Sequence, residues 1–542
     1  MLRQLYPFAL IAAVFATELP TILVDDATFV GTSDAGVESY LGIPFAQPPT
    51  GSLRFNLPQA VEAYSGTVNA TNYGPVCPQQ LLRQAPDLSG IPNATAELVS
   101  SGYVGPTDYG EDCLSVNVIR PANADNYTDL PVVAWMFGGA FEVGGTFTPY
   151  HGTDLVSHSI SIGKPVIYVS MNNRVSAFGF LASKEVKDAG VGNLGLHDQR
   201  LALKWIQKYI GSFGGDASLI TLWGGSAGAI SIASQLVAYD GNTEGLFHGI
   251  FAQSGSPMSV GDLTDGQKYY DFLVEETGCS DATSTLDCLR EAEYETLLQA
   301  MSKTPLVWDY ESLHLAWLPR VDGVLFSDNP QRLLEQKKVA QVPIITGDAD
   351  DEGTLFTFSQ LNITTDEEFS EYIATNYLPG VPEDDVRELL ELYPSTPSEG
   401  SPFDTGDENA LTPQFKRLAA IQGDIMFQAP RRFLLNALAG YTDIWTFIYR
   451  RDKNETPGMG TYHGHDVANS YSGGELADYL VNFMYDLDPN GGNSTVWPKW
   501  TPEERSILSL DDGETPVSVQ QDTFRQDAIQ KVWEVFLEYP WA

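Results

Sequence analysis

The stretch that decides the fold of this 542-residue chain is Gly224-Gly225-Ser226-Ala227-Gly228. Before it, Leu219 to Trp223 is an apolar and partly β-branched run, which predicts a buried strand. After it, Ala229 to Ala238 is rich in Ala, Ile, Ser and Leu and predicts a helix packed closely on that strand. Strand, G-x-S-x-G and helix in this order are typical of a nucleophile elbow, whose glycines allow a tight turn that exposes the serine hydroxyl. A turn of small residues without chemistry is the alternative, but the flanking strand and helix favour a catalytic Ser226.

Further short apolar runs predict a mostly parallel sheet. Helical stretches such as Gln199 to Ile210 stand between some of these runs, and apolar strands that alternate with helices indicate an α/β fold whose sheet is covered on both faces. In such sheets the reactive groups lie on loops at the carboxyl ends of the strands. The predicted strands are Pro131–Phe137, Lys164–Ser170, Leu219–Trp223, Gly249–Gln253, Val342–Thr346 and Ile444–Tyr449.

A serine nucleophile needs a base to take its proton and a carboxylate to orient that base. The chain has seven histidines, and two of them, His463 and His465, stand in a glycine-containing segment soon after the last predicted strand. The acid is expected in Gly347 to Thr354, which directly follows another predicted strand. Three of the four carboxylates in that segment fit a solvated loop. The resulting order of serine, acid and histidine is typical of α/β-hydrolases.

The glycine-rich turn from Phe137 to Phe141 also follows a predicted strand. Its amides, together with the amide of Ala227, are expected to donate hydrogen bonds to an oxyanion as charge develops on it. A phosphate-binding loop is the alternative, but no G-x-x-x-x-G-K-S/T or dinucleotide motif accompanies the turn. We therefore interpret it as part of an oxyanion hole.

The amino terminus and the cysteines predict secretion. A charged start, an apolar core and a small residue at the cleavage position indicate a signal peptide of residues 1–16, which leaves one domain of residues 17–542. The four cysteines form two sequence-local pairs. Local pairing gives Cys77–Cys113 and Cys279–Cys288, although two other connectivities are open. The glycosylation candidates are the sequons at Asn69, Asn93, Asn126, Asn362, Asn454 and Asn493.

Charge and composition exclude several classes of partner. The net charge of −41 and the pI near 4.3 argue against nucleic acid or anionic lipid headgroups as partners. No apolar run after the signal peptide is long enough to cross a bilayer, so an extracellular, soluble protein is expected. The cysteine spacing lacks the close C-x-x-C pairs of zinc sites, and we predict neither a metal nor an organic cofactor. The sequence indicates no oligomeric state.

Along nearly its whole mature length the chain resembles the type-B carboxylesterase/lipase family of α/β-hydrolases, and within it the secreted fungal lipases and sterol esterases. The resemblance implies a mostly parallel central sheet flanked by helices, with a disulfide-closed lid loop at residues 78–112. It rests on Tyr40–Ala46 with Pro48-Pro49 and Leu53-Arg54-Phe55, on Glu111–Val118, on Gly192–Arg200, on Phe213–Asp216 before the elbow, and on Gln253-Ser254-Gly255.

The resemblance also implies roles for single residues. Ser226 corresponds to the nucleophile, Glu352 to the acid and His463 to the base. The family pairing of cysteines matches both local pairs given above. The amides of the oxyanion hole correspond to Gly139, Ala140 and Ala227, and Ser254 is expected to hydrogen-bond the acid.

Two departures from the family pattern bear on substrate choice. Gly225 stands where the family commonly has an acidic residue, which disfavours choline-like cationic esters. Ala140 stands where the nearest lipases often have a third glycine, and catalysis is expected to survive because backbone amides do the stabilising.

Residues 78–112 mix leucines with charged side chains. We interpret them as an amphipathic flap that covers an apolar gorge in water and opens against a lipid surface. A static loop that buries its leucines permanently is the alternative.

The expected reaction is hydrolysis of carboxylic esters through an acyl-enzyme. The expected substrates carry large apolar groups, as in glycerides, sterol esters and long-chain esters, and the enzyme is expected to meet them at a lipid–water interface. A carboxylesterase for compact aryl or feruloyl esters is the first alternative. A catalytically inactive adhesion protein of the same fold is a second, disfavoured because all three triad positions are filled.

Overall fold

The computed structural model describes residues 19–80, 88–101, 108–122, 129–146, 151–492 and 494–541. The predicted signal peptide, the sequons at Asn126 and Asn493 and part of the 78–112 segment lie outside the described residues. In these described ranges the strands form two sheets, one of three strands and one of eleven. The smaller contains β1 Thr21–Val24, β2 Asp26–Val30 and β5 Ser65–Asn69. The larger contains β3 Thr32–Asp34, β4 Val37–Pro44, β6 Ser115–Pro121, β7 Leu130–Met136, β8 Ile167–Met171, β9 Gly215–Gly225, β10 Gly249–Gln253, β11 Ile344–Ala349, β12 Ile444–Tyr449, β13 Ser506–Leu510 and β14 Val517–Gln521.

The central sheet is mostly parallel, which confirms the predicted fold class. Its strand order is β14-β13-β12-β11-β10-β9-β7-β8-β6-β4-β3. All neighbours from β8 through β13 pair in parallel, and the strands at both ends of the sheet pair antiparallel. The six predicted strands are β7 to β12, and the largest difference is at β9, which begins four residues before the expected start because Gly215 already pairs with Leu130.

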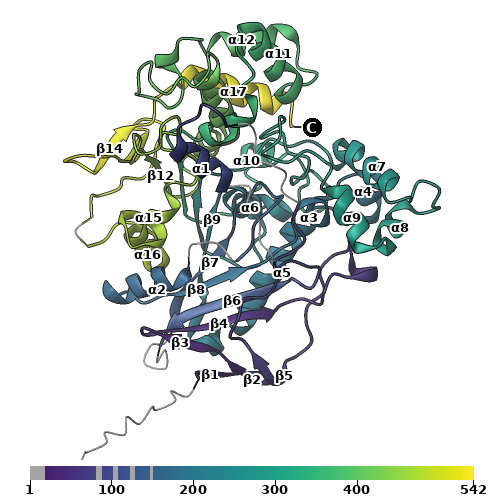
Figure 1. Ribbon diagram of the computed structural model, residues 1–542. Coiled ribbons are helices and arrows are strands. Elements are labelled where there is room, and N and C mark those ends of the chain that lie inside the picture. The colour runs from purple at the N-terminus through teal and green to yellow at the C-terminus, as the bar shows by residue number, and fades with distance from the viewer. Residues whose placement is uncertain are drawn as a thin grey trace, which may run out of the picture.

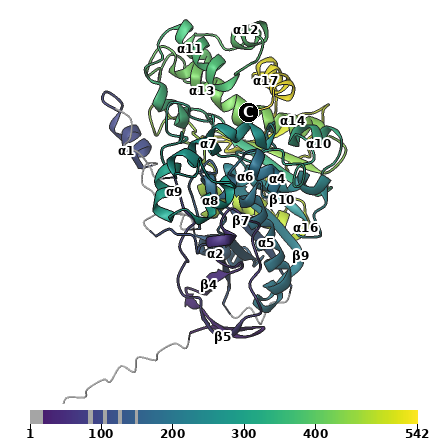
Figure 2. The same ribbon diagram turned by 90° about the vertical axis from the view of Figure 1, so that its right-hand side faces the viewer.

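Both faces of the sheet are buried, as the continuous apolar runs require. Along β7, Val132, Ala134 and Met136 point into the larger hydrophobic core, whereas Val133 and Trp135 point into a second core on the other face. The larger core includes side chains of α5 and α6, and the second includes side chains of α2 and α16. Because successive side chains of a strand point to opposite faces of the sheet, α5 and α6 cover one face and α2 and α16 cover the other (Figures 1 and 2). The helices are α1 Asn93–Ser101, α2 Gly152–Ser161, α3 Ser176–Phe180, α4 Lys184–Ala189, α5 Leu194–Tyr209, α6 Ala227–Val237, α7 Gln267–Glu276, α8 Thr285–Glu291, α9 Tyr294–Met301, α10 Pro330–Glu335, α11 Asp366–Tyr372, α12 Glu383–Glu391, α13 Phe415–Gly423, α14 Ala429–Leu438, α15 Val467–Tyr471, α16 Glu475–Asp486 and α17 Gln526–Glu538.

Both predicted disulfides are present. Cys77 is bonded to Cys113 and Cys279 to Cys288, with sequence separations of 36 and 9 residues. Because a longer closed loop removes more entropy from the unfolded chain, the first bond is worth about 4 kcal/mol in the chain-entropy model. The Cys77–Cys113 bond closes the 78–112 segment at its base.

The described part of that segment contains α1, which stands at the edge of the molecule (Figure 2). Val99 of α1 is buried in a small hydrophobic cluster with Phe358, Phe415 and Met459. Thr95 is also buried, and its hydroxyl donates a 2.6 Å hydrogen bond to the carbonyl of Pro457. Helix α1 is thus docked on the body of the protein through one apolar face. Among the described residues, no helix combines the length and apolar character needed to cross a membrane.

Candidate active site

Five neighbouring parallel strands deliver the predicted site residues to one edge of the sheet. β9 leads into Ser226, β10 into Ser254, β11 into Glu352 and β12 into the loop of His463. β7 leads into the glycine turn that starts at Gly138. These residues come together because the carboxyl ends of parallel strands share one edge.

The chain makes a tight turn at Ser226, and close contacts around the turn leave no room for side chains at Gly224 and Gly228. The residue has φ 57° and ψ −129°, a conformation that side-chain-bearing residues rarely adopt. A Cβ atom on Gly228 would lie 2.0 Å from the carbonyl oxygen of Met136, and one on Gly224 would lie 2.6 Å from the carbonyl oxygen of Gly228. The amide of Ser226 donates a 2.8 Å hydrogen bond to the carbonyl of Gln253. The strand and helix can therefore approach closely only because glycine flanks the serine, which is the arrangement of a nucleophile elbow.

A histidine–glutamate pair adjoins the pocket that Ser226 lines. Nδ1 of His463 is 2.5 Å from Oε2 of Glu352, and both side chains are almost completely buried. The other glutamate oxygen, Oε1, accepts hydrogen bonds of 2.6 Å from the Ser254 hydroxyl and the Ala349 amide. These three donors fix the carboxylate so that it holds the imidazole in one orientation. Nε2 of His463 has no hydrogen-bond partner among the described residues, and the imidazole lines the same pocket as Ser226.

The glycine turn after β7 packs directly against the serine. A Cβ atom on Gly138 would lie only 2.8 Å from the Cβ atom of Ser226. Gly139 and Ala140 have φ angles of 118° and 56°, and within the described part of the chain their amides have no hydrogen-bond acceptor. Ala227 is the first residue of α6, where helix geometry leaves amides without an intrahelical partner. The predicted oxyanion donors therefore face the same pocket as the serine.

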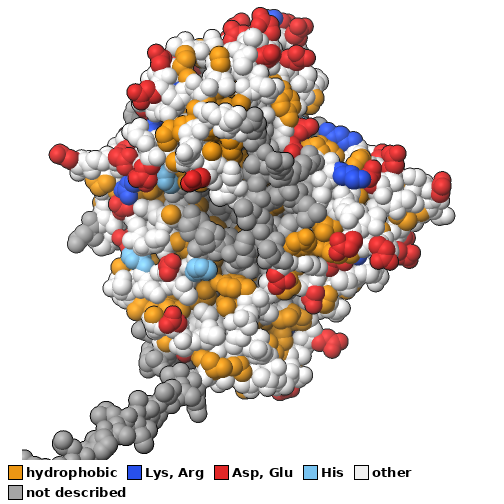
Figure 3. Space-filling view, viewed as in Figure 1, with side chains coloured by type: hydrophobic (Ala, Val, Ile, Leu, Met, Phe, Trp, Pro, Cys, Tyr) orange, Lys and Arg blue, Asp and Glu red, His pale blue; other side chains and the backbone are white. Residues whose placement is uncertain are grey.

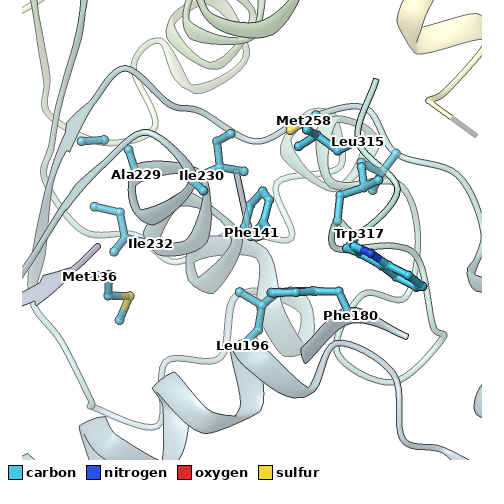
Figure 4. Close-up of a cluster of buried hydrophobic side chains, with 14 of the residues drawn as sticks. Met136, Phe141, Phe180, Leu196, Ala229, Ile230, Ile232, Met258, Leu315 and Trp317 are labelled. Atoms are coloured by element: carbon cyan, nitrogen blue, oxygen red, sulfur yellow. The ribbon is translucent and has the colours of Figure 1, made fainter. Parts of the chain in front are cut away.

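The pocket itself has a volume of about 300 Å³ and is predominantly apolar. Three of its lining side chains, Phe141, Ile230 and Leu315, belong to the larger hydrophobic core, and Phe141 lies between the other two (Figure 4). Trp308, Leu355 and Phe427 also line it. The site can accordingly bury a large hydrocarbon group beside the serine.

The expectation that three carboxylates of residues 347–354 are solvated is wrong for all three aspartates, and the first of them, Asp348, lies within β11 itself. Asp348, Asp350 and Asp351 are at most 3% exposed. Asp348 forms a 2.9 Å ion pair with Arg431, and Asp350 is paired with Lys453. Asp351 accepts hydrogen bonds from the neighbouring loops, at Ser401, Phe403 and Thr461. Burial is tolerated because each carboxylate has charged or hydrogen-bonding partners, which come from segments that local sequence does not reveal.

Two polar residues beside the site were not predicted as site residues. Gln253 accepts a 2.7 Å hydrogen bond from Nε1 of Trp223 and donates one of 2.7 Å to Oδ2 of Asp466. Asp466 is completely buried, and burial, reinforced by the negative charge of Glu352, raises its pKa to about 7. The available signals were weak: Gln253 belongs to the Gln-Ser-Gly motif, and Asp466 stands three residues after His463.

The buried Asp466 predicts a pH effect on stability. In the unfolded chain its carboxyl ionises near the ordinary pKa of 3.8, whereas in the folded protein it keeps its proton to about pH 7. Between these values the folded state binds more protons, so this group's contribution to the free energy of unfolding falls as the pH rises. Asp466→Asn removes the titration. The measurement is the free energy of unfolding in urea, compared between variant and wild type. The difference, variant minus wild type, should be more positive at pH 8 than at pH 5. An equal difference at both pH values would contradict the assignment.

A serine on a strand–helix elbow, a buried histidine–carboxylate pair and a glycine turn on one pocket define the α/β-hydrolase class. The model of the carboxylesterase family matches residues 25–530. The chain belongs to this family and is a carboxylic ester hydrolase.

Relatives match over almost the whole chain. Lipase 4 of Diutina rugosa is 40% identical, with 93% of each chain covered. A secreted triacylglycerol lipase of Gibberella zeae is 39% identical over 94% of this chain and 89% of its own. The crystal structure of Aspergillus niger EstA superposes with a TM-score of 0.80 at 27% identity, covering 96% of this chain and 98% of that chain.

Proposed function

We propose that Ser226, His463 and Glu352 carry out ester hydrolysis through an acyl-enzyme. Ser226 attacks the ester carbonyl while His463 accepts its proton, and Glu352 orients the imidazole and stabilises its charged form. His463 then protonates the leaving alcohol and activates water for deacylation. The amides of Gly139, Ala140 and Ala227 stabilise the oxyanion. The observation that carries the proposal is the His463–Glu352 contact of 2.5 Å on the pocket that Ser226 also lines.

The apolar pocket supports substrates with large hydrocarbon groups, such as glycerides, sterol esters and long-chain esters. Gly225, where the family commonly has an acid, lies beside Trp135 and Val467: a Cβ atom there would be 3.3 and 3.5 Å from their side chains. This wall supplies hydrocarbon rather than charge, which disfavours cationic alcohols. The relatives named as lipases support the same substrate class.

Secretion and action at a lipid surface are part of the same proposal. The relatives from Gibberella zeae and Botryotinia fuckeliana are named as secreted lipases, and Asn69, Asn93, Asn362 and Asn454 all have exposed side chains that glycans can reach. Acidic side chains are spread over the face shown in Figure 3, with apolar patches between them. We propose that residues 78–112 form a flap, docked through the buried Val99 of α1, that opens when it meets lipid.

Labelling by an organophosphonate tests the mechanism. The wild-type protein is expected to bind one phosphonyl group per chain, and Ser226→Ala none, while both give the same circular dichroism spectrum. Absence of labelling in the wild type would favour a catalytically inactive protein of this fold.

Initial rates on four esters test the substrate class. We expect p-nitrophenyl palmitate and cholesteryl oleate to be hydrolysed with higher kcat/KM than methyl ferulate, with p-nitrophenyl butyrate as a soluble reference. Methyl ferulate as the best substrate would instead establish the aryl esterase alternative.

A further inference from the structure

Glu142 is a buried carboxyl group beside the oxyanion turn that the proposed mechanism does not use. Its side chain is completely inaccessible to solvent, and its Oε2 atom accepts a 2.8 Å hydrogen bond from the amide of Val307. Burial raises the pKa of Glu142 well above the usual range, which favours the neutral acid. Since Val307 lines the pocket, the Glu142 side chain joins the oxyanion turn to the part of the pocket wall at Val307.

The backbone of Glu142 also holds the oxyanion turn. Its amide donates a 3.0 Å hydrogen bond to the carbonyl of Gly139. Its carbonyl accepts a 2.7 Å hydrogen bond from the Ser176 hydroxyl and one of 3.2 Å from the amide of Gln80. A shift of Glu142 therefore moves the residue whose amide is proposed to bind the oxyanion.

Two glutamines extend these contacts to the base of the 78–112 segment. Gln79 exchanges two hydrogen bonds with the backbone of Gly144, of 2.7 Å to its Oε1 and 2.5 Å from its Nε2. Nε2 of Gln80 donates to the carbonyls of Thr304 and Pro305 at 2.7 and 3.0 Å. Both glutamine side chains are at least 97% buried, and they follow closely after Cys77.

We propose that Glu142, Gln79 and Gln80 are positioning residues that hold the oxyanion turn in register with the pocket wall and with the disulfide-anchored base of the 78–112 segment. The proposal rests on the proposed function of the site. None of the three residues touches the reacting atoms. They act through Gly139, whose carbonyl accepts the Glu142 amide, through Gly144, which packs on the carbonyl of Gly138, and through Val307.

Such a role predicts a particular kinetic signature. The oxyanion amides bind charge that exists only in the transition state, so misplacing them lowers kcat and leaves ground-state binding largely unchanged. Removing one oxyanion donor outright costs about 10²- to 10³-fold in kcat, so displacing the turn is expected to cost about 10- to 100-fold. If these residues only kept the protein folded, their replacement would instead reduce the number of titratable active sites and leave kcat per site unchanged.

The test compares two variants of Glu142. Glu142→Leu keeps most of the volume and removes the acceptor for the Val307 amide, whereas Glu142→Gln keeps a neutral acceptor. With p-nitrophenyl butyrate, Glu142→Leu is expected to lower kcat about 10- to 100-fold. Its KM should change by less than about threefold, and phosphonate titration should still count one site per chain. Glu142→Gln is expected to stay within about threefold of wild-type kcat, because the acceptor is restored.

Gln79→Ala provides a second variant should Glu142→Leu not fold. Nε2 of Gln79 bridges two carbonyls, of Cys77 and Gly144. The matched control is Gln207→Ala, because Nε2 of Gln207 likewise bridges two carbonyls, of Ala217 and Gly245, each at 2.8 Å, and Gln207 lies on α5 and does not line the pocket. Gln79→Ala is expected to lower kcat per titrated site, and Gln207→Ala to leave it unchanged.

Three results would overturn the inference: unchanged kcat in Glu142→Leu and Gln79→Ala, a loss fully explained by fewer titratable sites, or equal losses in the Gln and Leu variants. Failure of the wild type to react with the phosphonate would instead reject the proposed function itself.

Discussion

Replacing His463 with alanine is expected to lower kcat on p-nitrophenyl butyrate by about 10⁴-fold or more, because the variant has no base to take the serine proton. Glu352 is then left buried without the imidazole, which it now contacts at 2.5 Å. KM should change far less than kcat, since the apolar pocket is retained. The measurement is steady-state kinetics on protein whose unfolding curve matches the wild type.

His465→Ala is the matched control for His463→Ala. His465 lies in the same loop, is also partly buried, and stacks on Tyr462 with ring centroids 4.6 Å apart. Its nearest carboxylate oxygen belongs to Asp452, 3.8 Å away, and not to Glu352. We expect kcat within about tenfold of wild type, as for a substitution that leaves the triad in place. Loss of activity in His465→Ala with retention in His463→Ala would reverse the assignment of the base.

Gly228→Ala is expected to destabilise the fold by more than about 3 kcal/mol, a large effect for one methyl group. The added carbon would lie 2.0 Å from the carbonyl oxygen of Met136, at the end of β7 in the centre of the sheet. That contact is with backbone, which no side-chain rotation can relieve. Soluble yield and urea unfolding measure the loss, which is expected to remove most of the folded protein at 37 °C.

Gly211→Ala is the corresponding control. A Cβ atom on Gly211 meets nothing within 4 Å, and its φ lies outside the left-handed region. Its free energy of unfolding should change by less than about 1 kcal/mol, as is usual for Gly→Ala at a compatible position. Equal losses in both variants would mean that the close approach at the elbow does not limit stability.

The sequence predicts the central part of the fold because that part depends on local pattern. The strand before Ser226 and the helix after it can be recognised from apolar runs, and the glycines on both sides are required by steric contacts between adjacent segments. The choice of His463 over His465 came from family resemblance, because two histidines two residues apart in one loop have no local feature that separates them.

The residues that sequence reasoning missed depend on distant partners. Glu142 is buried because Val307, 165 residues away in the chain, supplies its hydrogen-bond donor. Asp348 stands in an acidic segment of the sequence, yet its side chain is buried with Arg431, 83 residues later in the chain. Such pairings arise from tertiary packing, so the local sequence indicated a solvated loop for Asp348 and gave no signal for Glu142.

The proton held by Asp466 has a consequence for the surroundings of the enzyme. Ester hydrolysis near neutral pH releases a carboxylic acid, which ionises and acidifies a poorly buffered medium. As the medium falls from pH 7 towards pH 5, the contribution of Asp466 to the free energy of unfolding rises, because its pKa in the folded protein is raised to about 7. The Arg451 hydrogen bond lowers the pKa of Glu475 to about 2, so that ion pair persists through the same drift. Accumulating product thus favours the native state at this carboxyl, whereas His314 and His465, whose pKa values are lowered by burial, respond to the same acidification in the opposite sense.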